Sequence, residues 1–285
     1  MQTSIRIGSA LACAMLVGGI PALAHGADAA SVASAASAAS SACSGLPSFG
    51  ALKTALQDVV DAGGNGGLGN DMWATVVNRD GIVCNVAFTG DSRGDQWPGS
   101  RVISAQKANT ANAFSRPSGV IGFAGALSTA NLYSAVQSGG TLFGLQESNP
   151  VSTRVAYGGN PAHYGQSNDP MDGQRIGGVN VFGGGLALYN AAGALVGGVG
   201  VSGDTSCTDH IVAWKLRFAL NLDNVPAGVS PTGDDNIIHD VTVDPETGHT
   251  VSAKGFGHPE CDATATDVAK TLPEKYPIGP AAPSK

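Results

Sequence analysis

The amino-acid sequence predicts an α/β/α sandwich in which helices flank a central antiparallel sheet. Two pairs of strand-like segments are each joined by a short turn, and helical patterns precede, separate and follow these pairs. Glycine accounts for 41 of the 285 residues and charged residues for only 13% of them. This composition favours tight turns and close backbone packing over long helices held by salt bridges.

The N-terminal region has the features of an export signal. Arg6 is followed by an apolar run over residues 7–20 and by Ala-Leu-Ala at positions 22–24, a small-x-small cleavage sequence. We therefore expect a signal peptide over residues 1–24 and a secreted or periplasmic protein. The apolar run is too short for a membrane span, so we expect no span after cleavage. Residues 25–45 are rich in Ala and Ser, which is typical of a flexible linker.

The first predicted elements are a helix and a hairpin. Apolar residues recur at helical spacing from Phe49 to Ala62, and Gly63-Gly64 ends this helix. The segment from Met72 to Asn78 alternates as a strand does, and Asp80-Gly81 is a hairpin turn signal. The return strand runs from Ile82 to Phe88.

Two further helices and a long loop come next. A helix from Ser100 to Phe114 begins with a capping residue and is stopped by Pro117. A third helix is expected from Leu127 to Gln137. The segment from Asn149 to Gly178 is rich in Gly, Pro, Asn and Asp and indicates a long ordered loop, a kind of segment that is often functional.

A second hairpin and a last core helix complete the sandwich. The hairpin strands are expected from Val179 to Tyr189 and from Ala194 to Val201, and the helix from Cys207 to Leu220. Ser206 is the predicted N-cap of that helix, with Asp209 in a capping-box arrangement.

The predicted domain covers residues 46–222, and residues 223–285 form a C-terminal extension that is packed on the core or partly disordered. The extension is rich in Pro, Gly and Asp, with a possible edge strand from Ile237 to Val243. No internal repeat is present in the sequence.

Four cysteines remain after removal of the signal peptide, and an even number in an exported protein predicts disulfides. We favour a Cys207–Cys261 bond, which would join the last core helix to the extension and leave Cys43 to pair with Cys84. The alternative is that Cys84 is a buried free thiol in its strand.

Charge and motifs exclude several classes of function. The net charge of −7 and the lack of any basic cluster argue against a nucleic-acid partner and a polybasic membrane anchor. The sequence has no Gly-x-Ser-x-Gly motif and no Cys-x-x-Cys-His motif for covalent haem. We therefore assign no catalytic residue.

The corner between the last strand and the last helix is the most distinctive motif. Gly198, Gly200 and Gly203 leave little side chain there, which predicts room for a flat ligand or a neighbouring strand. The free N–H groups at the start of the helix favour an anion, and Ser202 and Gly203 would contribute to that site.

Three segments resemble the GlcG/HbpS family of haem-binding proteins. They are the corner motif Gly-Val-Ser-Gly at 200–203, the segment 105–111, which resembles a Lys-Ala-x-Thr-Ala helix, and the hairpin from Trp73 to Val83. The resemblance extends over residues 49–220, although the proline that family members have before the last hairpin is absent from 183–188. It implies a profilin-like fold, non-covalent haem or another flat acidic small molecule as ligand, and a homo-oligomer.

Four side chains are candidates to contact such a haem. Lys107 shares an apolar helix face, so its ammonium could pair with a haem propionate, unless it is an ordinary surface lysine. His210 is a candidate iron ligand beside the corner, and His163 and Tyr164 are candidates in the long loop. For each of these three the alternative is a structural role.

These observations predict an exported haem-binding protein that scavenges or senses haem. One alternative is a small-molecule enzyme, such as a haem-degrading protein or an accessory protein of organic-acid metabolism, for which His210 is the acid–base candidate. Another alternative is a non-catalytic cell-surface module.

Overall fold

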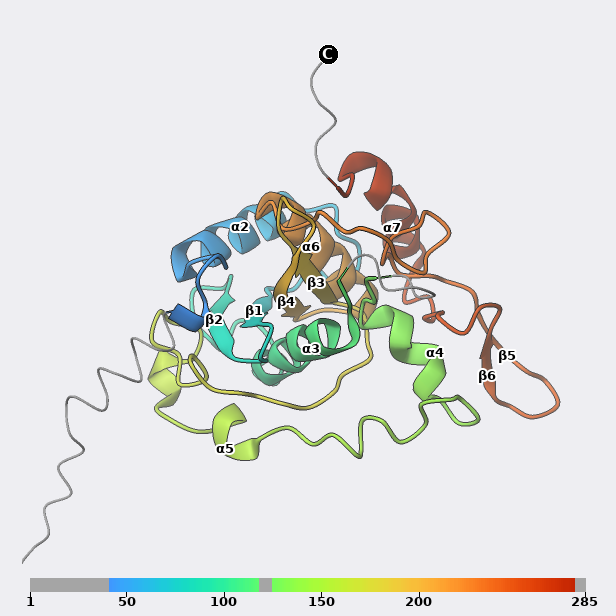
Figure 1. Ribbon diagram of the computed structural model, residues 1–285, viewed down its shortest axis with the longest axis horizontal. Helices are drawn as coiled ribbons and strands as arrows, with labels where there is room; N and C mark the ends of the chain where they lie inside the picture. The colour runs from blue at the N-terminus through green and yellow to red at the C-terminus, as the bar shows by residue number, and fades with distance from the viewer. Residues whose placement is uncertain (1–40, 118–124, 280–285) are drawn as a thin grey trace, which may run out of the picture.

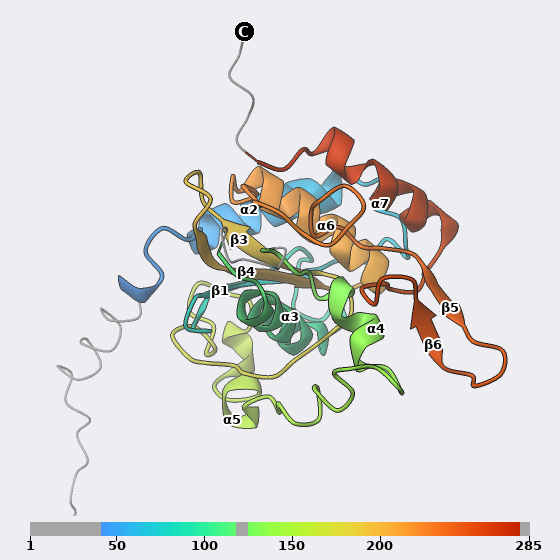
Figure 2. The same ribbon diagram turned by 45° about the vertical axis from the view of Figure 1, so that its right-hand side comes forward.

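A computed structural model describes residues 41–117 and 125–279 of the chain. The predicted signal peptide and most of the predicted linker lie outside the described residues. The described chain forms three layers, with a sheet between helices on both of its faces (Figure 2). This arrangement confirms the predicted α/β/α sandwich.

The central sheet has four antiparallel strands in the order β2-β1-β4-β3 (Figure 1). The first hairpin consists of β1, Trp73–Asn78, and β2, Val83–Phe88, and the second of β3, Gly185–Tyr189, and β4, Leu195–Ser202. The two hairpins meet where β1 pairs with β4, so that Trp73 lies opposite Ser202. Both predicted hairpins are confirmed, although β3 is shorter than predicted because residues 179–184 form a loop.

One face of the sheet is covered by α2, Phe49–Asp61, and α6, Ser206–Ala219. Their apolar side chains form the larger core cluster together with one face of β1 and β4. The N-cap of α6 is Thr205, which accepts a hydrogen bond from the Thr208 N–H, rather than the predicted Ser206. No helix in the two described ranges is both long and apolar enough to cross a membrane.

The opposite face is covered by α3, Ser100–Phe114, and the glycines of β4 set how closely it packs. A Cβ atom at Gly200 would overlap the carbonyl oxygen of Ser104, and one at Gly198 would overlap that of Ala108. The glycine-rich strand therefore makes room for a helix of the same chain, and the sequence prediction of room for a ligand there is wrong.

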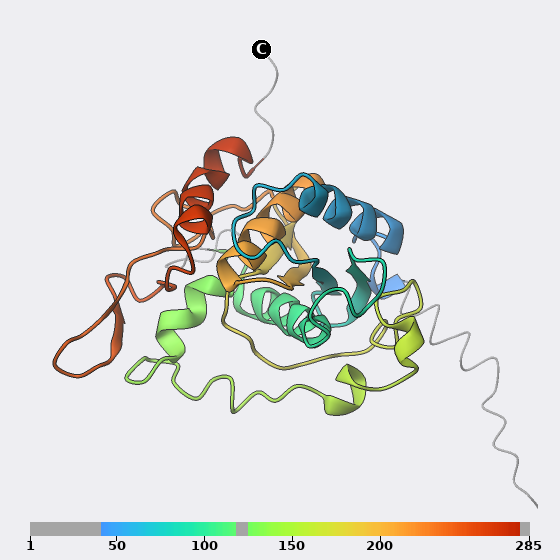
Figure 3. The ribbon, with the colours of Figure 1, turned by 180° about the vertical axis from the view of Figure 1, so that it is seen from behind.

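The long loop between residues 149 and 178 passes beneath α3 (Figure 3). It contains two short helices, α5, Thr153–Ala156, and η2, Pro161–His163. Arg101 of α3 forms a buried ion pair with Asp169 of this loop and so anchors it to the sandwich. The predicted long ordered loop is confirmed.

The segment from residue 125 to 148 contains little helix. A 3-10 turn, η1, Ala130–Leu132, leads directly into α4, Tyr133–Val136. The prediction of one helix from Leu127 to Gln137 was too long, because Ser128 and Asn131 bond to each other's backbone and compete with helical hydrogen bonds.

The C-terminal extension packs on the core. It forms a small hairpin from β5, Val241–Val243, and β6, Thr250–Ser252, and then α7, Ala263–Lys275, beside α6 (Figure 2). Of the edge strand expected from Ile237 to Val243, only the last three residues form a strand. This strand pairs with β6 rather than with the central sheet.

Two covalent bonds and an ion pair hold the terminal segments to the sandwich. The predicted disulfides Cys43–Cys84 and Cys207–Cys261 are both present. Arg217 of α6 forms a bidentate ion pair with Asp235 of the extension, and both side chains are fully buried.

The outer strands of the sheet are partly covered by loops. At β3, Gly185 exchanges hydrogen bonds with Thr129, and Tyr189 bonds to the backbone of residues 222 and 224. At β2, Val83 bonds to the backbone of residues 173 and 174.

Candidate functional site

The most suitable pocket for an organic ligand lies at the N-terminal end of α3, and we call it the α3 pocket. It has a volume of about 540 Å³, within the range of about 300–1,000 Å³ typical of ligand sites. Four parts of the chain form it: the start of β1, the loop after β2, the start of α3 and the long loop. Its lining residues are Trp73, Ser92, Arg93, Gly94, Pro98, Gly99, Arg101, Tyr157, Pro161 and Tyr164.

Arg101 forms a rigid wall of this pocket. Its guanidinium bonds to both carboxylate oxygens of Asp169 and donates to the Ala156 carbonyl oxygen at 2.9 Å. It also stacks on the Tyr164 ring, with 3.7 Å between the guanidinium carbon and the ring centre. These contacts use three of the five guanidinium N–H groups and pair the charge with Asp169, so Arg101 mainly orders the pocket.

Two other residues that line the α3 pocket, Trp73 and Arg93, carry polar groups without a partner in the described part of the chain. Trp73 is 1% exposed, and its indole Nε1–H is a buried donor with no acceptor in the described part of the chain. Arg93 is exposed and forms none of the ion pairs found among residues 41–117 and 125–279. A ligand with apolar rings and a carboxylate would match these groups and the aromatic lining.

Of the two loop candidates, Tyr164 lines this pocket and His163 is not among its lining residues. The Tyr164 hydroxyl donates to the Gly158 carbonyl oxygen at 3.1 Å. His163 is exposed, in η2 between the two lining residues Pro161 and Tyr164. The two neighbours named from sequence therefore differ: the Tyr164 hydroxyl has a partner, whereas the His163 side chain faces solvent.

Lys107 has a protein partner instead of the predicted ligand. Its side chain is 2% exposed, and its Nζ lies 2.7 Å from Oδ2 of Asp209. Burial raises the pKa of the Asp209 carboxyl to about 6, although Lys107 acts in the opposite direction. This pair joins α3 to α6, so the prediction that Lys107 offers its charge to a propionate is corrected by the structure.

His210 is also inside the core. It is fully buried, and its Nε2 accepts a hydrogen bond from the Ile237 N–H at 3.1 Å. Burial and the nearby Arg217 hold the pKa of His210 well below its ordinary value, so the imidazole is neutral. In this position it cannot reach a ligand iron, which corrects the predicted role as a metal ligand.

The predicted anion site at the corner is filled by the protein's own carboxylates. Ser202 and Gly203 are buried there. Asp209 accepts the Asp204 N–H, and Asp204 accepts the Thr205 N–H at 2.6 Å. The backbone N–H groups of Asp204 and Thr205, which follow Ser202 and Gly203, therefore already have carboxylate partners.

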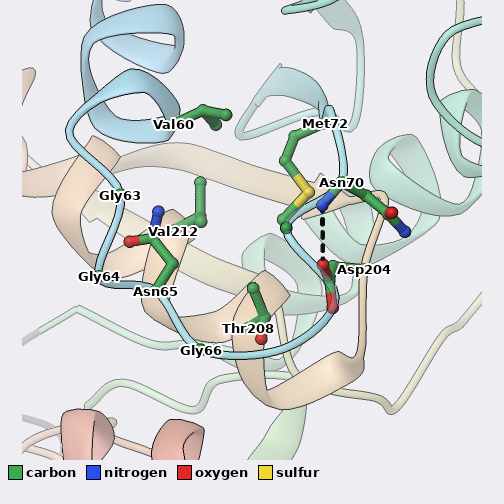
Figure 4. A pocket seen from close by; sticks show the side chains of 11 residues that line it. Val60, Gly63, Gly64, Asn65, Gly66, Asn70, Met72, Asp204, Thr208 and Val212 are labelled. Carbon is green, nitrogen blue, oxygen red and sulfur yellow. Dashed lines mark hydrogen bonds between the residues drawn. The ribbon is translucent and has the colours of Figure 1, made fainter.

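A pocket beside this corner is too small for a large ring system. Its volume is about 140 Å³, and the glycine-rich loop after α2 curves around it (Figure 4). Asp204 holds that loop, since its carboxylate accepts N–H bonds from Leu68 and Asn70. Size therefore favours the α3 pocket over the corner as the place for a tetrapyrrole.

Sequence reasoning missed Arg93 and Tyr157. Both lie in loops that the fold brings together at the start of α3, and no spacing in the sequence connects them. The available signal was the unusual length of the loop from residue 149.

Comparison with known proteins identifies related sequences and folds. The sequence profile of the family described as "Haem degrading protein HbpS-like" matches residues 51–216. No curated protein matches the chain.

Three solved structures are similar at low identity. A PduOC–haem complex has 23% identity and a TM-score of 0.39, covering 60% of this chain and 91% of that one. The Klebsiella pneumoniae protein ORFY, of family DUF336, has 21% identity and a TM-score of 0.40, covering 61% and 90%. HbpS has 19% identity and a TM-score of 0.36, covering 60% and 86%.

Proposed function

We propose, from the premise that this chain belongs to the HbpS-like family, that it binds haem non-covalently in the α3 pocket. The observation that carries the proposal is the combination of an aromatic lining with an exposed arginine and a buried indole donor without a partner. Binding rather than turnover is the proposed activity.

The chemistry of the pocket fits a haem group. The rings of Trp73, Tyr157 and Tyr164 offer faces and edges to a flat macrocycle. Arg93 offers charge to a propionate, and the Trp73 Nε1–H offers a hydrogen bond to an acceptor on the ligand. Tyr157, which is 66% exposed, gives the pocket an apolar rim where one edge of the ring would remain in water.

His163 is the proposed iron ligand. Histidine, tyrosine and methionine can all bind haem iron. The hydroxyl of Tyr164 already bonds to Gly158, and Met171 is fully buried. His163 is exposed and directly precedes the lining residue Tyr164 in the chain. When bound, the haem would supply iron for ligand binding or redox sensing.

An exported haem carrier is the role that these features support best. The two disulfides support an oxidising compartment, as expected for a secreted or periplasmic protein. Scavenging requires a high affinity for haem, whereas sensing requires a partner that responds to the haem-bound state. We also propose that the chain assembles into a homo-oligomer.

Titration with haemin tests the site. We expect a shifted Soret band and one haem per chain. Arg93→Glu should weaken binding at least about tenfold, because a like charge replaces the cation near the propionate, and His163→Ala should change the position of the Soret band. Lys254→Glu and His249→Ala are matched controls, since both residues are exposed and in the C-terminal extension. Equal haem affinity of Arg93→Glu and Lys254→Glu would contradict the proposed site.

A further inference from the structure

Cys207, Cys261 and His258 form a cluster that the haem proposal does not use. One ligand atom from each, the two sulfurs and a ring nitrogen, lie within 4.8 Å of one another. Cys207 and His258 are almost completely buried, whereas Cys261 is exposed. Tetrahedral zinc has bonds of about 2.3 Å to sulfur and 2.0–2.1 Å to nitrogen, so its ligand atoms are roughly 3.5–4 Å apart. In the disulfide the two sulfurs are 2.01 Å apart, so after reduction they must separate by roughly 1.5–2 Å to reach the zinc spacing.

We propose that reduction of the Cys207–Cys261 disulfide converts this cluster into a zinc site. A thiol or phosphine reductant supplies two electrons, and with two protons the S–S bond becomes two thiols. Zinc then binds both sulfurs and the His258 nitrogen, and the two thiol protons are released to solvent. The extension would thus be attached to α6 by a disulfide in one redox state and by a metal ion in the other.

The surroundings of the sulfurs favour thiolates. Cys207 lies in the first turn of α6, and its N–H points to the Cys261 sulfur at 3.2 Å. The Ser206 hydroxyl lies 3.5 Å from the same sulfur. Donors and a helix N-terminus stabilise a thiolate, which is the form that binds zinc. Because Cys261 is exposed, a reductant can reach the bond.

One ring nitrogen of His258 has the partner expected of a zinc-binding imidazole, and the other accepts a long backbone hydrogen bond that zinc would have to displace. Its Nδ1 lies 2.7 Å from the Pro259 carbonyl oxygen, and its Nε2 is 3.4 Å from the Gly183 N–H. A carbonyl partner on one ring nitrogen is common for histidines that bind zinc through the other.

His239 is the proposed fourth ligand, and its ring would have to move toward the cluster, since the group of atoms within 4.8 Å of one another contains only Cys207, His258 and Cys261. Its ring centre is 6.5 Å from that of His258. Both of its ring nitrogens are buried without a hydrogen-bond partner in the described chain, although the backbone of residues 258 and 259 lies nearby. Buried polar atoms without partners often mark the place of an ion or water.

Cobalt(II) titration of the full chain tests the proposal, since cobalt reports thiolate ligands by charge-transfer absorption. Protein reduced with a phosphine should bind one cobalt per chain with this absorption, and oxidised protein should not. After reduction, the variant Cys43→Ser/Cys84→Ser retains both proposed sulfur ligands and should behave like the reduced wild type. Cys207→Ser/Cys261→Ser should show no such absorption.

Histidine variants show whether the site has the proposed composition. His258→Ala should weaken cobalt binding at least about tenfold, His239→Ala should change the ligand-field bands, and the exposed control His249→Ala should change neither. An unchanged affinity in His258→Ala overturns the proposal. The proposal is also overturned if the reduced protein remains folded by circular dichroism and shows no charge-transfer absorption with cobalt. It is overturned as well if the protein unfolds on reduction and added zinc does not restore its fold.

Discussion

At the scale of single residues, Asp172 is a carboxyl group in an unfavourable position. Its Oδ1 is buried without a partner in the described chain. The neighbouring Asp169 is already paired with Arg101. Burial, with the charge of Asp169 as a second cause, raises the pKa of Asp172 to about 8. The folded protein therefore keeps a proton on Asp172 at neutral pH.

This raised pKa gives a pH-dependent prediction. Between about pH 4 and pH 8 the unfolded state releases the Asp172 proton and the folded state keeps it, so the free energy of unfolding falls as the pH rises. Asp172→Asn removes this effect. We expect the variant to be more stable than wild type at pH 8 by on the order of 2 kcal/mol, after allowing for partial exposure, and to lose the advantage below pH 4.

Urea unfolding from pH 4 to pH 8 measures this difference. The control is Asp91→Asn, which changes an exposed aspartate and should leave the pH profile of wild type. Parallel stability profiles of Asp172→Asn and wild type would show that Asp172 is ionised in the folded protein.

At the scale of secondary-structure elements, α3 packs closely on β4 because the glycines of β4 have no side chain. Gly200→Ala places a methyl group against the Ser104 carbonyl oxygen and should lower the free energy of unfolding by about 1–3 kcal/mol or more. Gly50→Ala, in an open position of α2, should instead raise it by up to about 1 kcal/mol. Chemical unfolding of both variants checks the opposite signs. An unchanged free energy of unfolding in Gly200→Ala would mean that α3 can move away from the sheet without a loss of stability.

The ion pair between α3 and α6 is the second element-scale feature. Lys107→Met leaves the Asp209 carboxylate buried without its cation and should cost about 3–5 kcal/mol of stability. Adding Asp209→Asn should recover part of this loss, because the neutral amide needs no cation and can still accept the Asp204 N–H. The free energies of unfolding of the wild type, both single variants and the double variant give the interaction energy between Lys107 and Asp209.

This series also tests the original hypothesis for Lys107. If Lys107→Met keeps its stability and loses haem affinity, the lysine contacts the ligand as the sequence indicated. The structure predicts the reverse outcome, with reduced stability and, in the folded fraction, unchanged haem affinity.

At the scale of the whole molecule, the C-terminal extension is part of the folded unit. Asp235→Ala leaves Arg217 buried without its partner and should lower the free energy of unfolding by about 3–5 kcal/mol. Asp267→Ala removes the exposed pair with Lys270 and should change it by less than about 0.5 kcal/mol. Thermal unfolding distinguishes the two. Equal melting temperatures would indicate an extension that detaches freely from α6.

The sequence predicts the sandwich well because its signals are local. Alternating strands, Asp80-Gly81 and helical apolar spacing each lie within about a dozen residues, and the structure confirms the elements that they predict. It predicts α7 poorly, since Ala, Thr and an internal Pro273 mask the helical pattern. The partner of Lys107 could not be predicted, because Asp209 is 102 residues away. The α3 pocket was missed for the same reason, as only folding brings Arg93 to Tyr157.

The loops that cover the ends of β3 and β2 limit how copies of this chain can associate. Thr129 and residues 222–224 occupy both ends of β3, and residues 173–174 occupy one end of β2. Only a few backbone groups in the middle of each outer strand remain free to pair with a foreign strand. The central sheet is therefore a poor starting point for an intermolecular ladder. The separate β5–β6 hairpin, in which Val243 and Val251 are exposed, is not covered by these loops.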